Sequence, residues 1–252
     1  MAKAIKKKDD TAMVSTERPE WMEDDSMRGQ EGVGVDDLTI PRLGVIQDLS
    51  PQRKKTAPEY IEGADSGMLF NTVTGRLYGT EVMFVPVYYR KEWVIWKSVN
   101  AGGGFNGAFP TEAGARAEFS EKEMEGQLDD KGNDLYEIND TGQQFGLVLN
   151  DDGSVEDIVM SMSKSKRKVD RQFNTMIKMA GRDRFSRVYK ISAVEDQNAA
   201  GQDYFNFGVA PLGFVNEDTF LYAEKMYEAI SSGAKDVNRD SESAAAADSA
   251  EY

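Results

Sequence analysis

The chain of 252 residues contains neither cysteine nor histidine. Without cysteine it can form no disulfide, thiol nucleophile or thiolate metal site. Without histidine it lacks the imidazole groups of catalytic triads, proton shuttles and the usual zinc sites. Because these absences exclude most enzyme classes, we expect a protein that is not an enzyme and needs no metal or cofactor.

Long apolar runs are also missing. No stretch is long enough to cross a membrane, and the lysines at positions 6–8 are followed by two aspartates instead of the hydrophobic region of a signal peptide. The sequence therefore predicts a soluble intracellular protein. It does not decide whether the protein forms a homo-oligomer.

Positive charge is concentrated in one segment. The chain has a net charge of −14, which would ordinarily argue against a nucleic-acid partner. Residues 163–190, however, contain ten lysines and arginines and two aspartates, so this segment carries +8 and the remainder −22. A positive block of this kind predicts a site for an anion such as a phosphate backbone.

The segment 81–109 holds two of the three tryptophans. Residues 82–89 and 92–97 are rich in β-branched and aromatic side chains and predict strands. Both faces of each strand are apolar, which indicates burial between two layers or a face that stacks on a ligand. Cations among rings suit a nucleic-acid strand. The alternative is a pair of core strands joined by a turn at Arg90 and Lys91. The candidate binding residues here are Tyr88, Tyr89, Arg90, Lys91, Trp93, Trp96, Lys97 and Phe105.

The basic segment predicts an amphipathic helix. Ser163 or Ser165 is expected to cap a helix that runs to about Ala180. Its apolar stripe is Val169, Phe173, Met176, Ile177 and Ala180. At about 100° per residue, Arg167, Arg171 and Lys178 fall on the opposite face, which is almost purely positive and predicts phosphate contact. The candidate phosphate-binding residues are Lys164, Arg167, Lys168, Arg171, Lys178, Arg182, Arg184, Arg187 and Lys190.

Composition divides the chain into three parts. Residues 1–33 predict a disordered arm, 34–233 a folded domain, and 234–252 an acidic disordered tail. The domain contains short predicted strands with glycine-rich turns, a helix-permissive insertion at 111–128 and a closing helix capped by Asn216. This pattern predicts a mainly β protein with added helices, an OB-fold-like small barrel with a helical insertion and a C-terminal helix.

Two other functions compete with nucleic-acid binding. Asp151, Asp152, Glu156 and Asp157 suggest the metal site of a carboxylate-dependent nuclease. Their spacing fits no cation loop, and a solvated hairpin tip explains them better. A structural or assembly protein could use the same rings as an interface, but that function leaves the one-sided basic helix without a reason.

Five blocks of the sequence resemble a group of bacteriophage proteins. They are DDLTIPRLGVIQDLSPQ (36–52), EYIEGADSGMLFNTVTG (59–75), VPVYYRKEWVIWK followed by GGGF (85–105), SMSKSKRKVDRQFNTMI (161–177) and YKISAVEDQNAAGQDYFNFGVAPLGFV (189–215). The group is that of phage single-stranded DNA-binding proteins, similar in plan to those of T7-like replication. The resemblance implies an OB-fold core, a basic ring-lined cleft and an acidic C-terminal tail that ends in an aromatic residue. Tyr252 stands where T7-like proteins carry phenylalanine, and alanine and serine dilute the acids of the tail.

The resemblance implies a function in phage DNA replication and recombination in the host cytoplasm. The protein would bind single-stranded DNA without sequence preference, by aromatic stacking and phosphate neutralisation. Its tail would bind the phage DNA polymerase or another replication protein. The tail residues expected to do so are Asp240, Glu242, Asp248, Glu251 and Tyr252.

Overall fold

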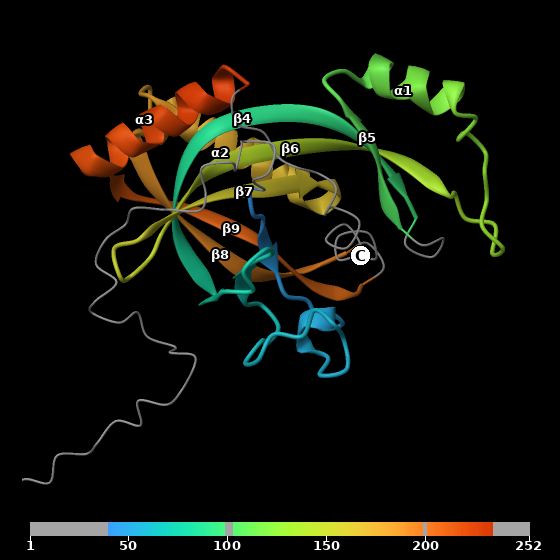
Figure 1. The fold of residues 1–252 in the computed structure, drawn as a ribbon, viewed down its shortest axis with the longest axis horizontal. Helices are drawn as coiled ribbons and strands as arrows, with labels where there is room; N and C mark the ends of the chain where they lie inside the picture. Colours follow the sequence, from blue (N-terminus) through green and yellow to red (C-terminus); the bar gives the residue numbers. More distant parts are fainter. Residues whose placement is uncertain (1–39, 99–102, 199–200, 234–252) are drawn as a thin grey trace, which may run out of the picture. The chain divides into compact units, whose positions relative to one another are not determined.

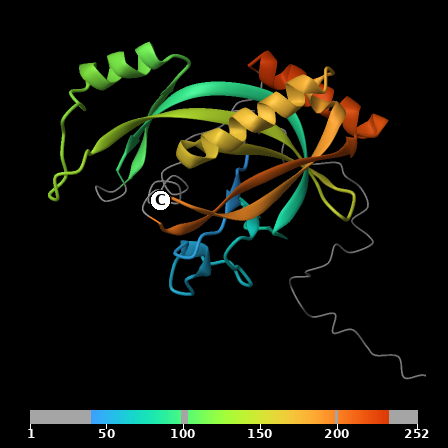
Figure 2. The ribbon, with the colours of Figure 1, turned by 180° about the vertical axis from the view of Figure 1, so that it is seen from behind.

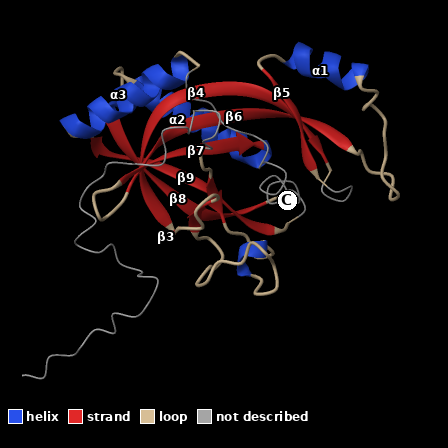
Figure 3. Cartoon of the chain, in the orientation of Figure 1, coloured by secondary structure: helices blue, strands red, loops and turns tan. Residues whose placement is uncertain are grey.

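The computed structural model describes residues 40–98, 103–198 and 201–233, all within one compact unit (Figure 1). The predicted arm 1–33 and the acidic tail 234–252, with its partner-binding residues, lie outside the described residues. Strands dominate the described part, and helices accompany them (Figure 3). The predicted mainly β class with added helices is therefore confirmed.

The described strands form two antiparallel sheets. The small sheet has the order β1–β2–β3, and the large sheet has the order β7–β6–β4–β8–β9, with β5 paired to β4. The bounds in the small sheet are β1 Leu43–Val45, β2 Leu69–Asn71 and β3 Leu77–Gly79. Those in the large sheet are β4 Glu81–Lys97, β5 Gly104–Phe109, β6 Tyr136–Leu149, β7 Val155–Ser163, β8 Arg187–Gln197 and β9 Asp203–Phe214.

The large sheet is open. Among the described strands, β7 and β9 are the outer ones and do not pair with each other. The closed small barrel that the sequence predicted is thus not formed by these strands. Its basis was a series of short strands, whereas several of the strands are long. Arg90 and Lys91, which the alternative interpretation placed in a turn, pair with Gln143 and Gly142 of β6.

The long strand β4 is the centre of the sheet and follows an arched course (Figure 1). One edge pairs with β6 along most of its length, and the register shifts between Pro86 and Tyr88. The other edge pairs with β8 at its start, from Glu81 to Phe84, and with β5 at its end, from Trp93 to Lys97. Between these two pairings no described strand pairs with this second edge of β4.

In the described ranges three α-helices accompany the sheets: α1 Glu112–Glu121, α2 Arg167–Met179 and α3 Glu217–Ser231. The predicted cap of α3 is confirmed, because Asn216 accepts from the backbone N–H of Thr219, and Thr111 caps α1 in the same way by accepting from that of Gly114. The predicted cap of α2 at Ser163 or Ser165 is wrong, because Lys166 directly precedes that helix and makes no side-chain cap bond. Short 3₁₀ turns flank α2: η4 Lys164–Lys166 and η5 Arg184–Ser186. A further turn, η2 Pro51–Arg53, follows β1.

Helices cover both faces of the sheet, with α3 in front in Figure 1 and α2 in front in the reverse view of Figure 2. Phe84 of β4 joins Phe173 of α2 in one core cluster, and Val85 joins Met226 of α3 in a second cluster. The first half of β4 is apolar on both faces because each face is buried under a helix. This confirms the two-layer interpretation for that half.

A glycine allows α2 to approach the sheet closely. A Cβ atom at Gly142 of β6 would lie 2.5 Å from a carboxylate oxygen of Asp170 and 2.7 Å from the Arg167 guanidinium. Any side chain there would displace this pair of charges. Gly142 thus places the start of α2, and with it the basic segment, against the sheet.

Candidate nucleic-acid interface

Four basic side chains on α2 and in the turn after it are exposed. Lys168, Arg171 and Lys178 lie on α2, and Arg182 lies in the turn that follows. Within the described part of the chain, none of the four takes part in an ion pair. They form the surface that we name the α2 basic face, and they can meet phosphate without breaking an existing ion pair.

Arg167 lies elsewhere, so its predicted place on the outer face is wrong. It is 9% exposed, and its guanidinium pairs with Asp170 and, at 3.1 Å, with Asp140. It also donates to the hydroxyl of Tyr89 at 3.3 Å. Helical periodicity placed Arg167 beside Arg171, but strands β4 and β6 supply partners that bury it.

Arg184 is held in the same buried network. It donates to Gln144 of β6 and, at 2.9 Å, to Asn174 of α2, and its guanidinium lies 5.4 Å from the centre of the Tyr89 ring. Burial lowers the pKa of this guanidinium to about 10. Burial also raises the pKa of the Tyr89 hydroxyl, and the charge of Asp170 adds to that increase.

The remaining predicted bases have partners on the protein. Lys164 pairs with Glu137 at 2.7 Å, and Lys190 pairs with Glu81 at 3.1 Å. Arg187 lies 4.7 Å from the centre of the Phe214 ring. The exposed ion pairs of Lys164 and Lys190 are weak and exchange readily, so these two lysines could turn to another anion at little cost.

The bases near the rings of β4 are also engaged. Arg90 pairs with Glu92 at 3.5 Å and lies 5.2 Å from the centre of the Phe145 ring. Lys91 pairs with Asp140 at 3.6 Å. Lys97 is half-buried at the end of β4, beside β5.

The five predicted stacking rings are all half-buried, but they do not share one cleft. Tyr88 contacts the rings of Phe145 and Tyr227, on the side covered by α3. Tyr89 points the other way, into the network of Arg167. A single ring-lined cleft is not formed, because neighbouring residues of a strand face opposite sides of the sheet.

The other three rings lie toward the far end of β4. Trp93 stands under the ammonium of Lys91, 4.9 Å from its ring centre. Trp96 and Phe105 are paired across β4 and β5 and meet edge to face at 5.8 Å. Their partly exposed surfaces remain accessible to a stacking partner.

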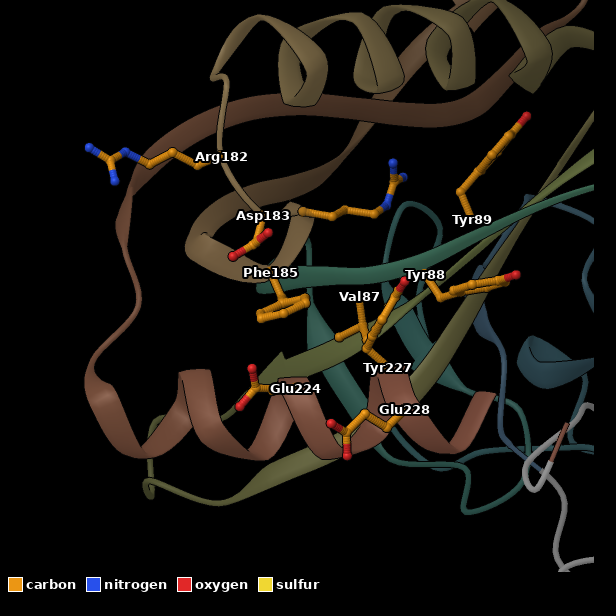
Figure 4. A pocket seen from close by; sticks show the side chains of 10 residues that line it. Val87, Tyr88, Tyr89, Arg182, Asp183, Phe185, Glu224, Tyr227 and Glu228 are labelled. Carbon is orange, nitrogen blue, oxygen red and sulfur yellow. The ribbon is translucent and has the colours of Figure 1, made fainter. Parts of the chain in front are cut away.

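A cavity of about 590 Å³ opens between β4, the α2–β8 turn and α3 (Figure 4). Its lining residues are Val87, Tyr88, Tyr89, Arg182, Asp183, Arg184, Phe185, Glu224, Tyr227 and Glu228. Tyr227 of α3 is 42% exposed. No local pattern marks Glu224, Tyr227 or Glu228 as functional, because the cavity depends on the gap beside β4.

The acidic hairpin is a structural element. Asp151 and Asp152 are exposed at its tip. Glu156 accepts hydrogen bonds from Tyr78 at 2.6 Å and Asn150 at 2.9 Å, and pairs with Arg76. In the described ranges no group of three or more acidic side chains is placed to hold a metal ion. No helix there is long and apolar enough to span a membrane.

Comparison with known families places the chain among phage proteins. The family model described as Pam3 phage gp34-like protein matches residues 7–236, which is most of the chain. The chain therefore belongs to the Pam3 phage gp34-like family. No curated protein and no solved structure matches it.

Proposed function

We propose that this phage protein binds single-stranded DNA during phage DNA replication or recombination. The observation that carries the proposal is the α2 basic face, where Lys168, Arg171, Lys178 and Arg182 are exposed without ion pairs in the described residues. A solvated helix face usually mixes charges of both signs. A face of one sign in a chain of net charge −14 is better explained by an anionic partner.

Partly exposed rings distinguish a single strand from a duplex as that partner. Arg182 belongs both to the basic face and to the cavity that Tyr88 and Tyr227 line. Unpaired bases stack on such rings while the phosphates meet the cations, and this mode tolerates any sequence. The acidic segment 234–252 would then recruit a polymerase or another replication protein.

Assembly through a sheet edge is the second candidate function. The outer strand β9 ends in a run of exposed residues that includes Leu212 and Phe214, which are 54% and 64% exposed. An exposed apolar edge strand favours pairing with another chain. A structural protein of the phage could use this edge, and binding of DNA would then be absent.

A titration with fluorescent dT oligomers and a matched duplex tests the proposal. We expect tighter binding to the single strand, with an affinity that falls as salt rises by a log–log slope of roughly −0.7 per phosphate neutralised. Equal affinity for the duplex, or no binding at low salt, contradicts it. Light scattering with and without the oligomer shows whether self-association through β9 accounts for the behaviour instead.

A further inference from the structure

The cavity beside β4 has walls of different chemistry. Glu224 and Glu228 project from α3, and Arg182 and Arg184 come from the α2–β8 turn. The rings of Tyr88 and Tyr227 meet at 6.0 Å between their centres. In Figure 4 the Arg182 side chain extends away from these rings. The Arg184 guanidinium lies 5.4 Å from the centre of the Tyr89 ring.

This cavity exists because one edge of β4 has a gap between its two pairing strands. On this edge β4 pairs with β8 up to Phe84 and with β5 from Trp93 onward. Val87 to Tyr89 lie in the interval, where no described strand pairs with that edge. The edge of β4 at Tyr88 is therefore without a neighbouring described strand, and the Tyr88 ring lies on the face of the sheet covered by α3, beside Tyr227.

Several polar groups on the walls have no partner in the described residues. The side chains of Glu224 and Glu228 make no ion pair, and the hydroxyls of Tyr88 and Tyr227 make no hydrogen bond. Carboxylates accept hydrogen bonds and cannot donate them. Acceptors beside exposed rings suit a flat, aromatic ligand that carries an amino group.

We propose that this cavity holds one unpaired base of the bound strand and prefers a base with an exocyclic amine. The base would pack against Tyr227 and donate its amine to Glu224 or Glu228, and the adjoining phosphate would meet Arg182 at the rim. Cytosine, adenine and guanine carry such an amine, and thymine does not. This inference rests on the proposed function and adds a base preference to it.

Cytosine and thymine give the cleanest comparison, because they are pyrimidines of similar size. Short dC and dT oligomers are titrated at mildly alkaline pH, where cytosine is neutral, and the ratio of their affinities is measured. We expect the wild-type protein to favour dC about fivefold, the lower range for a good hydrogen-bonded pair. The ratio cancels any change in repulsion that both oligomers experience equally.

The double variant Glu224→Ala/Glu228→Ala removes the acceptors and should bring the dC-to-dT ratio close to one. The control Glu217→Ala/Asp218→Ala removes the same charge from the first turn of α3, outside the cavity. It should leave the ratio unchanged. A wild-type ratio of one, or a preference that survives in the cavity variant, overturns the inference.

A second pair of variants tests the ring. Tyr227→Ala should weaken the binding of both oligomers about tenfold, as expected for the loss of one stacking ring. Tyr222→Ala is matched to it on the same helix, since Tyr222 is 46% exposed and does not line the cavity. Circular dichroism checks that both fold. Equal affinities for the two tyrosine variants overturn the base site.

These results separate the inference from the proposed function. A wild-type protein that binds neither oligomer contradicts both. A wild-type protein that binds the oligomers normally, and whose affinities do not respond to the cavity variants, keeps the function and loses only this site.

Discussion

Both sides of α2 carry cations, and these cations differ in what surrounds them. On the inner side, Arg167 lies between Asp140 and Asp170 and is 9% exposed. On the outer side, Arg171 and Lys178 face solvent and form no ion pair with a described residue. The inner cation helps to attach the helix to the sheet, and the outer cations are free to bind an anion. A basic block in a sequence can therefore contain both cations that hold a helix to the sheet and cations that bind an anion. The two kinds are distinguished only by the side chains around them in the fold.

The largest expected effect comes from breaking the inner side. Asp170→Ala removes a fully buried carboxylate, so less negative charge remains to balance the guanidinium groups of Arg167 and Arg184. We expect the free energy of unfolding to fall by about 3–5 kcal/mol, as for a broken buried ion pair. Urea denaturation measures this change.

A matched substitution at the exposed hairpin tip, Asp151→Ala, should change the free energy of unfolding by less than about 0.5 kcal/mol. If Asp170→Ala costs no more than this control, the network around Arg167 does not stabilise the fold.

The outer side should show the opposite result. Replacing Arg171 and Lys178 by alanine should leave the free energy of unfolding within about 0.5 kcal/mol of wild type, because both side chains are exposed. The log–log salt slope of single-strand binding should become shallower by roughly 1.4, or 0.7 for each phosphate that is no longer neutralised. Anisotropy titrations at several salt concentrations measure the slope.

Two lysines elsewhere provide the control for this variant. Lys54→Ala/Lys55→Ala removes the same charge from an exposed loop after η2. If both double variants change the slope equally, only net charge matters and the α2 basic face has no special role.

Sequence alone predicts features that depend on near neighbours. The caps at Thr111 and Asn216 were predictable because each side chain bonds the backbone three residues away. Ile158, Met160 and Met162 alternate along β7 and all lie in the same buried cluster, as their period of two predicts.

Features that depend on distant partners were not predictable from the sequence. Arg90 and Lys91 look like a turn until Gln143 and Gly142 are seen beside them. Arg167 looks exposed until Asp140 of β6 is placed next to it. In both cases the residue's partner lies on another strand, and a periodic pattern within one segment of the sequence cannot identify it. Polar residues at the centre of a long strand therefore need the sheet register before they can be interpreted.

A smaller loss of stability is expected at Glu156, whose carboxylate links β7 to side chains of the small sheet. Burial of this carboxyl acts to raise its pKa, but hydrogen bonds from Tyr78, Asn150 and Asn71 and the charge of Arg76 outweigh burial and lower it. A carboxyl with a lowered pKa stabilises the fold above its unfolded pKa, and this contribution is lost as the pH falls through the folded pKa.

In Glu156→Gln we expect the free energy of unfolding to fall by about 1–2 kcal/mol at neutral pH, since hydrogen bonds to a charged group are replaced by weaker ones. The difference from wild type should shrink at acidic pH, below the ordinary pKa of a glutamate, where the wild-type carboxyl is itself protonated. Thermal unfolding followed across this range measures it. A difference that stays constant down to the most acidic pH would mean that ionisation of Glu156 does not contribute.

The smallest expected effect concerns the acidic segment that follows α3. Residues 236–252 contain five acids and one arginine. A tethered segment of this sign has a high effective concentration at a basic surface on the same chain. When no DNA is bound, it should occupy the α2 basic face, whose cations form no ion pair with described residues. The inner cation Arg167 should not bind this segment, because it is already paired with Asp140 and Asp170.

Truncation after Gly233 should therefore tighten single-strand binding a few-fold at low salt, and the gain should shrink as salt screens the segment over a Debye length of about 10 Å at 0.1 M. In the Arg171→Ala/Lys178→Ala background, the same truncation should change the affinity less, because the surface for which segment and DNA compete is already weakened. An equal gain in both backgrounds would mean that the segment acts through net charge and not through α2. No gain at low salt would leave it without an autoinhibitory role, and the exposed side of α2 would then serve DNA alone.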